Sequence, residues 1–316
     1  MNTMKNKRWV QVLWTFLLAF CIVGMTSCDD RATGEELAKA GMSAANNLAN
    51  YYESLAQDTL DTWEMEAFLS SLRQVSFDAT QQKPLQEQID ALKSRARLAR
   101  ALASTYGALQ QLSSYDASAE MKGAADKLAQ EVKAIPVLPK STVDPSSLFG
   151  SLAGDIAAWR QSGDIRKGSK LLLEADENIL KLFKSEKEAC DSIPEERGNK
   201  IAAVIEHLIK KKMVVSWSLL QKETDALNLP WVSAQEPVED NVTIEAMIEL
   251  ARVRMKRLAF ISASAGDSIS QSLESLIENH KSFQDKKGLN LEGMLTLVQK
   301  AQSYLDEISK LRTEKK

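Results

Sequence analysis

The sequence predicts an all-α protein, an elongated multi-helix bundle of long antiparallel helical hairpins that follows a short N-terminal segment of different character. Through most of the chain, apolar residues recur at alternating steps of three and four positions, the period of a helix with one buried side. The chain has no sustained run of alternating apolar and polar residues and no hairpin turn signal, so strands are not expected. Such spacing is typical of long antiparallel bundles and coiled coils.

The expected helices follow these apolar stripes in chain order. They cover residues 35–57, 61–77, 84–115, 117–135, 146–162, 165–192, 195–227, 242–283 and 289–314. The stripe that supports the third helix consists of Leu85, Ile89, Leu92, Ala96, Ala99, Ala103 and Tyr106. A second stripe on the same segment consists of Leu98, Leu102, Leu109 and Leu112. The two stripes make an apolar face too wide for one neighbour, so this helix is expected to pack on more than one other helix.

The last two expected helices carry stripes of the same kind. The first has Ile244, Ile248, Ala251, Met255 and Leu258. The second has Leu291, Met294, Val298, Ala301, Leu305 and Ile308. Each is therefore expected to present one apolar seam to the rest of the bundle.

Proline and capping residues predict where several helices begin. Pro84 suits a first helical turn, and Asp61 has the spacing of a capping box with Glu64. Pro194 precedes two glutamates, which favour a helix N-terminus, so a new helix is expected to begin at residue 195.

Two longer breaks organise the chain. They lie at residues 136–145 and 228–237. The first contains three prolines and the second contains two. The first divides an N-terminal helical half, residues 35–135, from a C-terminal half, residues 146–316. Neither break is long or polar enough to require a flexible linker, so the two halves are expected to pack as one body.

The N-terminus has the layout of a secretory signal. Lys5, Lys7 and Arg8 precede an apolar run over residues 9–25, and small polar residues lead to Cys28. The stretch from Gly24 to Cys28 resembles the lipobox of bacterial prolipoproteins, although Met25 stands where that class usually has leucine. The resemblance implies acylation of the Cys28 thiol, with palmitate as the label to follow, and removal of residues 1–27.

Membrane attachment and an extracytoplasmic body follow from this segment. Residues 28–34 are expected to form a short tether after the signal. An uncleaved membrane anchor is the alternative, because the apolar run is long enough to span a bilayer. In both cases the basic residues keep the N-terminus inside and place the body outside the cytoplasm, in the periplasm of the cell envelope. Asp29 resembles the retention signal of enteric lipoproteins and favours the inner membrane.

Composition narrows the range of functions. Residues 1–27 hold three of the 40 basic residues and none of the 43 acidic residues, so the mature chain carries a net charge of −6. Nucleic acid is therefore not an expected partner. Once Cys21 is removed and Cys28 is acylated, Cys190 is the remaining cysteine, and it is expected to be a small buried apolar residue.

The sequence carries no catalytic motif, no cofactor motif and no metal-ligand spacing. No G-x-S-x-G or H-E-x-x-H pattern occurs. The two histidines, His207 and His280, lie far apart and are expected to be polar helix residues. The expected function is therefore a non-enzymatic scaffold or binding module for an envelope protein. A membrane-acting protein of the exclusion or toxin type is the first alternative, and a helical hydrolase with a site assembled in space is the second.

Two features are candidate interaction sites. Trp231 lies in a proline-flanked loop where it has no helical stripe to join, so it is a candidate for partner contact. The candidate lipid-facing basic residues are Lys210, Lys211, Lys212, Arg252, Arg254, Lys256 and Arg257.

Overall fold

The computed structural model describes most of the chain. It covers residues 4–76, 82–114, 118–139, 144–150, 165–211 and 241–313, together with residues 141, 152 and 154. Side chains are described from residue 32 onward, except for residues 112–114, 118, 146, 165, 166, 241–244, 247, 251, 254 and 313. The described helices are α1 (Met4–Leu72), α2 (Gln82–Ser114), α3 (Ser118–Lys133), α4 (Pro145–Phe149), α6 (Ile165–Lys210), α8 (Asn241–Gln284) and α9 (Leu291–Thr313).

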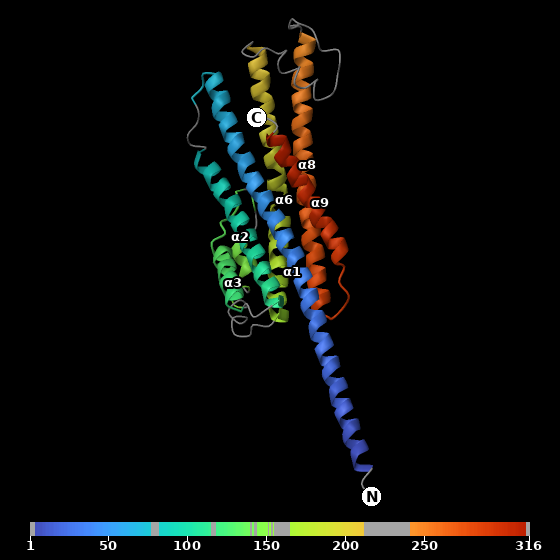
Figure 1. Cartoon of the computed structure of the whole chain (residues 1–316). Coiled ribbons are helices and arrows are strands. Elements are labelled where there is room, and N and C mark those ends of the chain that lie inside the picture. Colours follow the sequence, from blue (N-terminus) through green and yellow to red (C-terminus); the bar gives the residue numbers. More distant parts are fainter. Residues whose placement is uncertain are drawn as a thin grey trace.

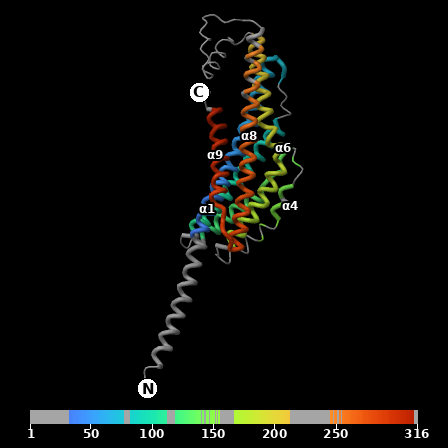
Figure 2. Tube along the Cα trace, turned by 90° about the vertical axis from the view of Figure 1, so that its right-hand side faces the viewer, coloured from blue at the N-terminus to red at the C-terminus, as the bar shows by residue number. Residues whose placement is uncertain are grey.

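The all-α fold class is confirmed, and no strand occurs among the described residues. Helix α1 lies at the centre and packs against α2, α6, α8 and α9 (Figure 1). Three antiparallel pairs build the bundle around it: α1 with α2, α6 with α8, and α8 with α9 (Figures 1 and 2). Helices α3 and the short α4 cover one side, against α2 and α6 respectively (Figure 2).

Two expected helix breaks are absent, the first of them in α1. The helix continues through residues 58–60 and includes residues 28–34, which were expected to be a tether. Thr59 and Thr62 lie inside the helix and donate their hydroxyls to the carbonyls of Leu55 and Asp58, at 2.9 and 2.7 Å. Asp61, the expected N-cap, instead accepts a hydrogen bond from Arg197 of α6 at 2.8 Å. The Asp61 carboxylate therefore binds a residue of another helix, and it does not cap a new helix as the local sequence predicted.

The second absent break is at Pro194, which lies inside α6 rather than before a new helix. A proline in a helix interior removes one backbone hydrogen bond and crowds the preceding turn. The hydroxyl of Ser192 donates to the carbonyl of Ala189 at 2.8 Å in that turn. This bond does not replace the one that Pro194 cannot donate to the carbonyl of Cys190, but the buried side chain of Ile193 holds the turn against the core.

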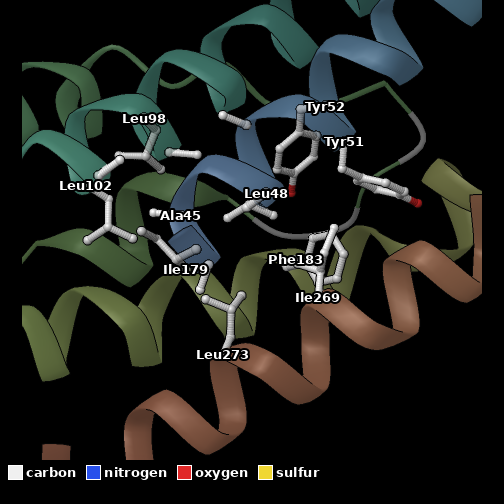
Figure 3. Close-up of a cluster of buried hydrophobic side chains, with 14 of the residues drawn as sticks. Ala45, Leu48, Tyr51, Tyr52, Leu98, Leu102, Ile179, Phe183, Ile269 and Leu273 are labelled. Carbon is white, nitrogen blue, oxygen red and sulfur yellow. The ribbon is translucent and has the colours of Figure 1, made fainter. Parts of the chain in front are cut away.

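The core is continuous and aromatic-rich at its middle. Tyr51 and Tyr52 of α1 meet Phe183 of α6 edge-on, with ring centroids 5.7 and 6.0 Å from it (Figure 3). Ile269 of α8 lies beside Phe183, and Leu273 lies one turn further along the same helix, beside Ile179 (Figure 3). The expected seam of α9 is buried from Met294 to Ile308, and α2 packs on α1, α3 and α6, as its two stripes predict.

Candidate functional site

Four polar side chains meet inside the bundle, close to the end at which α8 is joined to α9. We call them the buried tetrad: Tyr106 of α2, Ser169 and Asp176 of α6, and His280 of α8. The Ser169 hydroxyl lies 2.8 Å from Nδ1 of His280. Nε2 of the same ring lies 2.6 Å from the Tyr106 hydroxyl, which lies 2.5 Å from Oδ2 of Asp176. The tetrad thus forms an unbranched chain of three hydrogen bonds that joins three helices.

A heptad stripe on α6 places two members of the tetrad in the core. This α6 stripe has alternating steps of three and four and is buried throughout: Ser169, Leu172, Asp176, Ile179, Phe183, Glu186, Cys190, Ile193 and Arg197. Four of its nine positions are polar. Polar residues at such seam positions weaken a bundle but specify its register. Each of the four finds a partner on another helix, so α6 carries the polar groups that align its neighbours.

A glycine makes room for the tyrosine of the tetrad. The ring of Tyr106 lies directly on Gly41 of α1, where an added Cβ would stand 2.6 Å from Cδ1 of the ring. Real Cβ atoms do not approach other heavy atoms so closely, so any larger residue at position 41 must displace the ring. Gly41 therefore lets Tyr106 pass over α1 and reach His280 and Asp176.

Burial sets the charge state of the tetrad. It raises the pKa of Asp176 to about 8, although the hydrogen bond from Tyr106 opposes the shift. Burial also lowers the pKa of His280 to about 3 and raises that of Tyr106 well above its ordinary value. Below pH 8 the folded tetrad is therefore mainly uncharged, which is the form that a dry interior favours.

Serine, histidine and aspartate together are the groups of a hydrolytic triad, but their arrangement here differs. The aspartate side of the chain reaches Nε2 through a tyrosine, and the serine lies at Nδ1. All four side chains are fully or almost fully buried, and the surface cavities described below are lined by other residues. The chain of hydrogen bonds between these groups offers a path for proton movement within the core.

A second buried polar layer lies between α2 and α6, further from the α8–α9 turn than the tetrad. Arg95 of α2 and Glu186 of α6 form a two-point ion pair that is completely buried, with Nε to Oε2 at 2.6 Å. Nη1 of Arg95 also donates to the carbonyl of Ala91 at 2.9 Å. Burial alone would lower the pKa of Arg95, but the hydrogen bond and charge of Glu186 raise it above its ordinary value. The guanidinium and the carboxylate satisfy each other's hydrogen-bonding groups in the core.

The third polar layer joins three helices. Asp58 of α1 accepts from Arg312 of α9 at 2.5 Å and lies 3.2 Å from Nε of Arg197. Arg312 also donates to the carbonyl of Ser54 at 3.0 Å. Burial raises the pKa of Asp58, and the two arginines offset part of that rise. This layer fixes the C-terminal helix to the centre of the bundle.

A groove lies between α6 and α8, in the C-terminal part of α6. Its volume is about 390 Å³. Gly198 forms part of its wall and permits close contact with Met255 of α8, because a Cβ there would lie 2.8 Å from that residue's Cβ. The lining is mixed, with small or apolar residues and the charged residues Glu195, Glu206, Arg252 and Lys256.

Two shallower hollows lie elsewhere on the described surface. One, of about 640 Å³, runs between α1, α2 and α3 beside Arg100. The other, of about 430 Å³, lies on α9. Both are open depressions between exposed side chains, so neither encloses a small molecule.

Exposed apolar side chains lie beside the α6–α8 groove. Val253 and Phe260 are 52% and 70% exposed on α8. Lys256 lies between them on the same side of the helix, and Arg257 follows it. We call these four residues the α8 face.

Five of the predicted basic residues are described, and all five are exposed. Lys210 and Arg252 both bind Glu206, at 2.6 and 3.1 Å. Arg257 binds Glu307 of α9 at 2.8 Å. The other two are Lys211 and Lys256. The predicted residues thus lie together at one end of the α6–α8 pair, but much of their charge is balanced by carboxylates.

The remaining predicted site residues lie outside the described part of the chain. Trp231 and Lys212 belong to the segment between α6 and α8 that is not described, and the side chains of Cys28 and Arg254 are likewise not described. Among the described residues, no helix is long and apolar enough to cross a membrane, and no three ligand-type side chains are grouped as a metal site would require.

His280 is the member of the tetrad whose burial the sequence did not predict. It was expected to be a polar helix residue but is completely buried. A signal was present, because Leu273, Ile277 and His280 continue one apolar stripe at steps of four and three. Cys190, in contrast, is buried as expected, and burial raises the pKa of its thiol to about 12.

Comparison with protein-family models, with curated proteins and with solved structures finds no match to this chain. The site is therefore interpreted from its own geometry.

Proposed function

We propose that the chain is a lipid-anchored, non-enzymatic scaffold of a bacterial cell envelope that binds a protein partner through the α8 face. The observation that carries the proposal is the exposure of Phe260 and Val253 beside the α6–α8 groove. Large exposed aromatic residues next to a recess are typical of protein-binding surfaces. Lys256, which lies between the two apolar residues, suits a partner that presents apolar side chains with a carboxylate beside them.

The position of the α8 face along the bundle favours a protein partner over lipid. Phe260 precedes His280 by twenty residues of α8, a rise of about 30 Å. His280 lies at the level of Gly41, close to the end of the bundle that follows Cys28. A membrane that holds a lipid on Cys28 is therefore at the other end of the molecule. The ion pairs of Arg252 and Arg257 further weaken the case for binding to anionic lipid.

Site-specific photocrosslinking in living cells tests the surface. A photoreactive amino acid replaces Phe260 or Val253, and the matched control replaces Val137, which is also 52% exposed but lies between α3 and α4. The proposal expects one protein adduct of defined mass at positions 253 and 260 and none at 137. Lys256→Glu should reduce that adduct because it reverses a charge in the surface. Equal labelling at all three positions, or adducts to lipid alone, would contradict the proposal.

The anchor is tested separately. Cys28→Ser should abolish uptake of labelled palmitate and leave the chain unprocessed, with residues 1–27 still attached. A Cys190→Ser variant is the matched control and should keep the label, because its thiol is buried. Palmitate uptake by the Cys28→Ser variant would refute lipid attachment at that residue while leaving the α8 face untouched.

A further inference from the structure

The buried tetrad holds three hydrogen bonds in series, and each bond needs one proton between its two heavy atoms. Ser169, neutral His280 and Tyr106 supply three protons when Asp176 is ionised. In that state the serine donates to Nδ1, Nε2–H donates to the tyrosine oxygen, and the tyrosine donates to the carboxylate. Every proton is used and every bond is made.

Adding one proton to Asp176 allows the reverse order. The carboxylic acid then donates to the tyrosine oxygen, the tyrosine donates to Nε2, and Nδ1–H donates to the serine oxygen. No heavy atom has to move, because the same three distances of 2.5, 2.6 and 2.8 Å serve both directions. The serine keeps its own proton, which no longer lies between two members of the tetrad and can be donated to a backbone carbonyl of the preceding turn.

We propose that the tetrad is a built-in proton switch, in which one proton gained or lost at Asp176 reverses all three hydrogen bonds and changes His280 between its Nδ1–H and Nε2–H tautomers while the ring stays neutral. The histidine acts here as a relay within the core. The three hydrogen bonds join α2, α6 and α8. Their reversal therefore changes the hydrogen bonds that fix the first turns of α6 to its neighbours.

Two features of the site favour a single proton at Asp176. Oδ1 of this carboxylate has no hydrogen-bond partner among the described residues, so an ionised group there keeps one oxygen unsatisfied. Protonation of the Asp176 carboxylate removes its charge, so the oxygen without a partner then belongs to a neutral group. The imidazole lacks a direct carboxylate contact, since Nε2 lies 3.7 Å from Oδ2 of Asp176, with the tyrosine hydroxyl between them.

The surrounding charges do not compete for this proton. Helix α6 is packed by α1, α2, α4 and α8. On α6 itself, the charged residue that affects the pKa of Asp176 is Glu177, which raises it. Glu177 is paired with Lys281 of α8 at 2.7 Å. The other titratable residues of these elements at this level are the tetrad's own Tyr106 and His280, with Glu35, Glu36, Lys39, Lys170, Glu174 and Glu278 nearer the surface. Glu35 and Lys39 pair with each other at 2.7 Å, and α4 has no titratable side chain.

Nuclear magnetic resonance of the histidine nitrogens tests the switch directly. The full chain in detergent micelles is labelled with ¹⁵N-histidine, which gives signals from two residues, and His207→Gln assigns them. Long-range proton–nitrogen correlation then identifies the protonated nitrogen of His280 between pH 6 and 9.5. We expect Nδ1–H at low pH and Nε2–H at high pH, with a midpoint near the pKa of Asp176, about 8.

Two variants separate the switch from a merely structural cluster. Asp176→Asn should leave His280 in one tautomer at every pH, because the amide cannot gain or lose a proton in this range. Tyr106→Phe should uncouple the ring from Asp176 and leave one tautomer throughout. One unchanging tautomer in the folded wild type, or protonation of both ring nitrogens in this range, would overturn the proposal. The wild-type titration decides this outcome even if either variant fails to fold.

Discussion

Removal of one partner from the buried Arg95–Glu186 pair is expected to cost far more stability than removal of both. In Arg95→Met the carboxylate of Glu186 stays in the core without its two donors, and in Glu186→Leu the guanidinium is left unpaired. Each single change should lower the free energy of unfolding by about 3–5 kcal/mol, the cost of an uncompensated buried charge. Arg95→Met with Glu186→Leu fills the same space with apolar side chains, so the double variant should lie within about 1 kcal/mol of the wild type or exceed it.

The assay is thermal unfolding followed by far-ultraviolet circular dichroism in a mild detergent. At about 2 °C or more per kcal/mol, each single variant should lose roughly 6–20 °C, and the double variant should recover most of that loss. Arg97→Met is the matched control on the same helix, because Arg97 is 59% exposed and meets Glu131 at 3.4 Å. It should cost at most about 1 kcal/mol. Additive losses in the double variant would refute the reasoning that desolvation dominates this pair.

Three further outcomes follow from the buried groups. Between pH 6.5 and 8 the free energy of unfolding should fall as pH rises, by up to about 2 kcal/mol, because folded Asp176, with a pKa of about 8, keeps a proton that the unfolded chain has lost. From about pH 4 to 6.5 the curve should be nearly flat, because the lowered pKa of His280, about 3 when folded, gives the opposite slope. Gly41→Ala should destabilise by about 1–3 kcal/mol by displacing the Tyr106 ring, despite alanine's better helix propensity. Cys190, buried and with its pKa raised to about 12, should resist alkylation in the native state and react once the chain unfolds.

Each of these outcomes has a control in the same chain. Asp176→Asn should remove the fall in stability between pH 6.5 and 8, and a fall that persists in this variant would assign it to another group. Gly123→Ala in α3 should be neutral or stabilise by up to about 1 kcal/mol, because a Cβ there meets no atom within 4 Å. Alkylation of Cys190 in the wild type below its melting temperature would show local opening of α6 near Pro194.

Most of the fold could be predicted from sequence because its dominant signal is periodic. The α9 seam from Met294 to Ile308 and the two stripes of α2 from Ile89 to Leu109 are buried as expected, and apolar packing alone explains their burial. The helix breaks at residue 60 and at Pro194 were predicted wrongly, since local signals were read without their tertiary context. Asp61 looks like a cap until Arg197 is placed beside it, and that residue is 136 positions away.

The buried polar layers were harder to predict, although part of their signal was visible. Asp176 and Glu186 occupy seam positions of a heptad, but a carboxylate in a helix is far more often solvated than buried. The partners that reverse this expectation, Tyr106 and Arg95, come from α2. Only the packing of the helices reveals them, so the tetrad could not be assembled from spacing alone.

The central place of α1 also has a consequence for how the chain acquires its structure during synthesis. Asn47 of α1 donates to the carbonyl of Val298 of α9 at 2.9 Å, across 251 positions of sequence. At about 5–20 residues per second, α1 waits roughly 10–50 s for that partner to be made. Throughout this interval one side of α1 lacks the helix that finally covers it. Nascent chains without α9 should therefore be the species most prone to aggregation and most dependent on chaperones, and truncation before Leu291 should be more harmful than the position of α9 at the chain's end suggests.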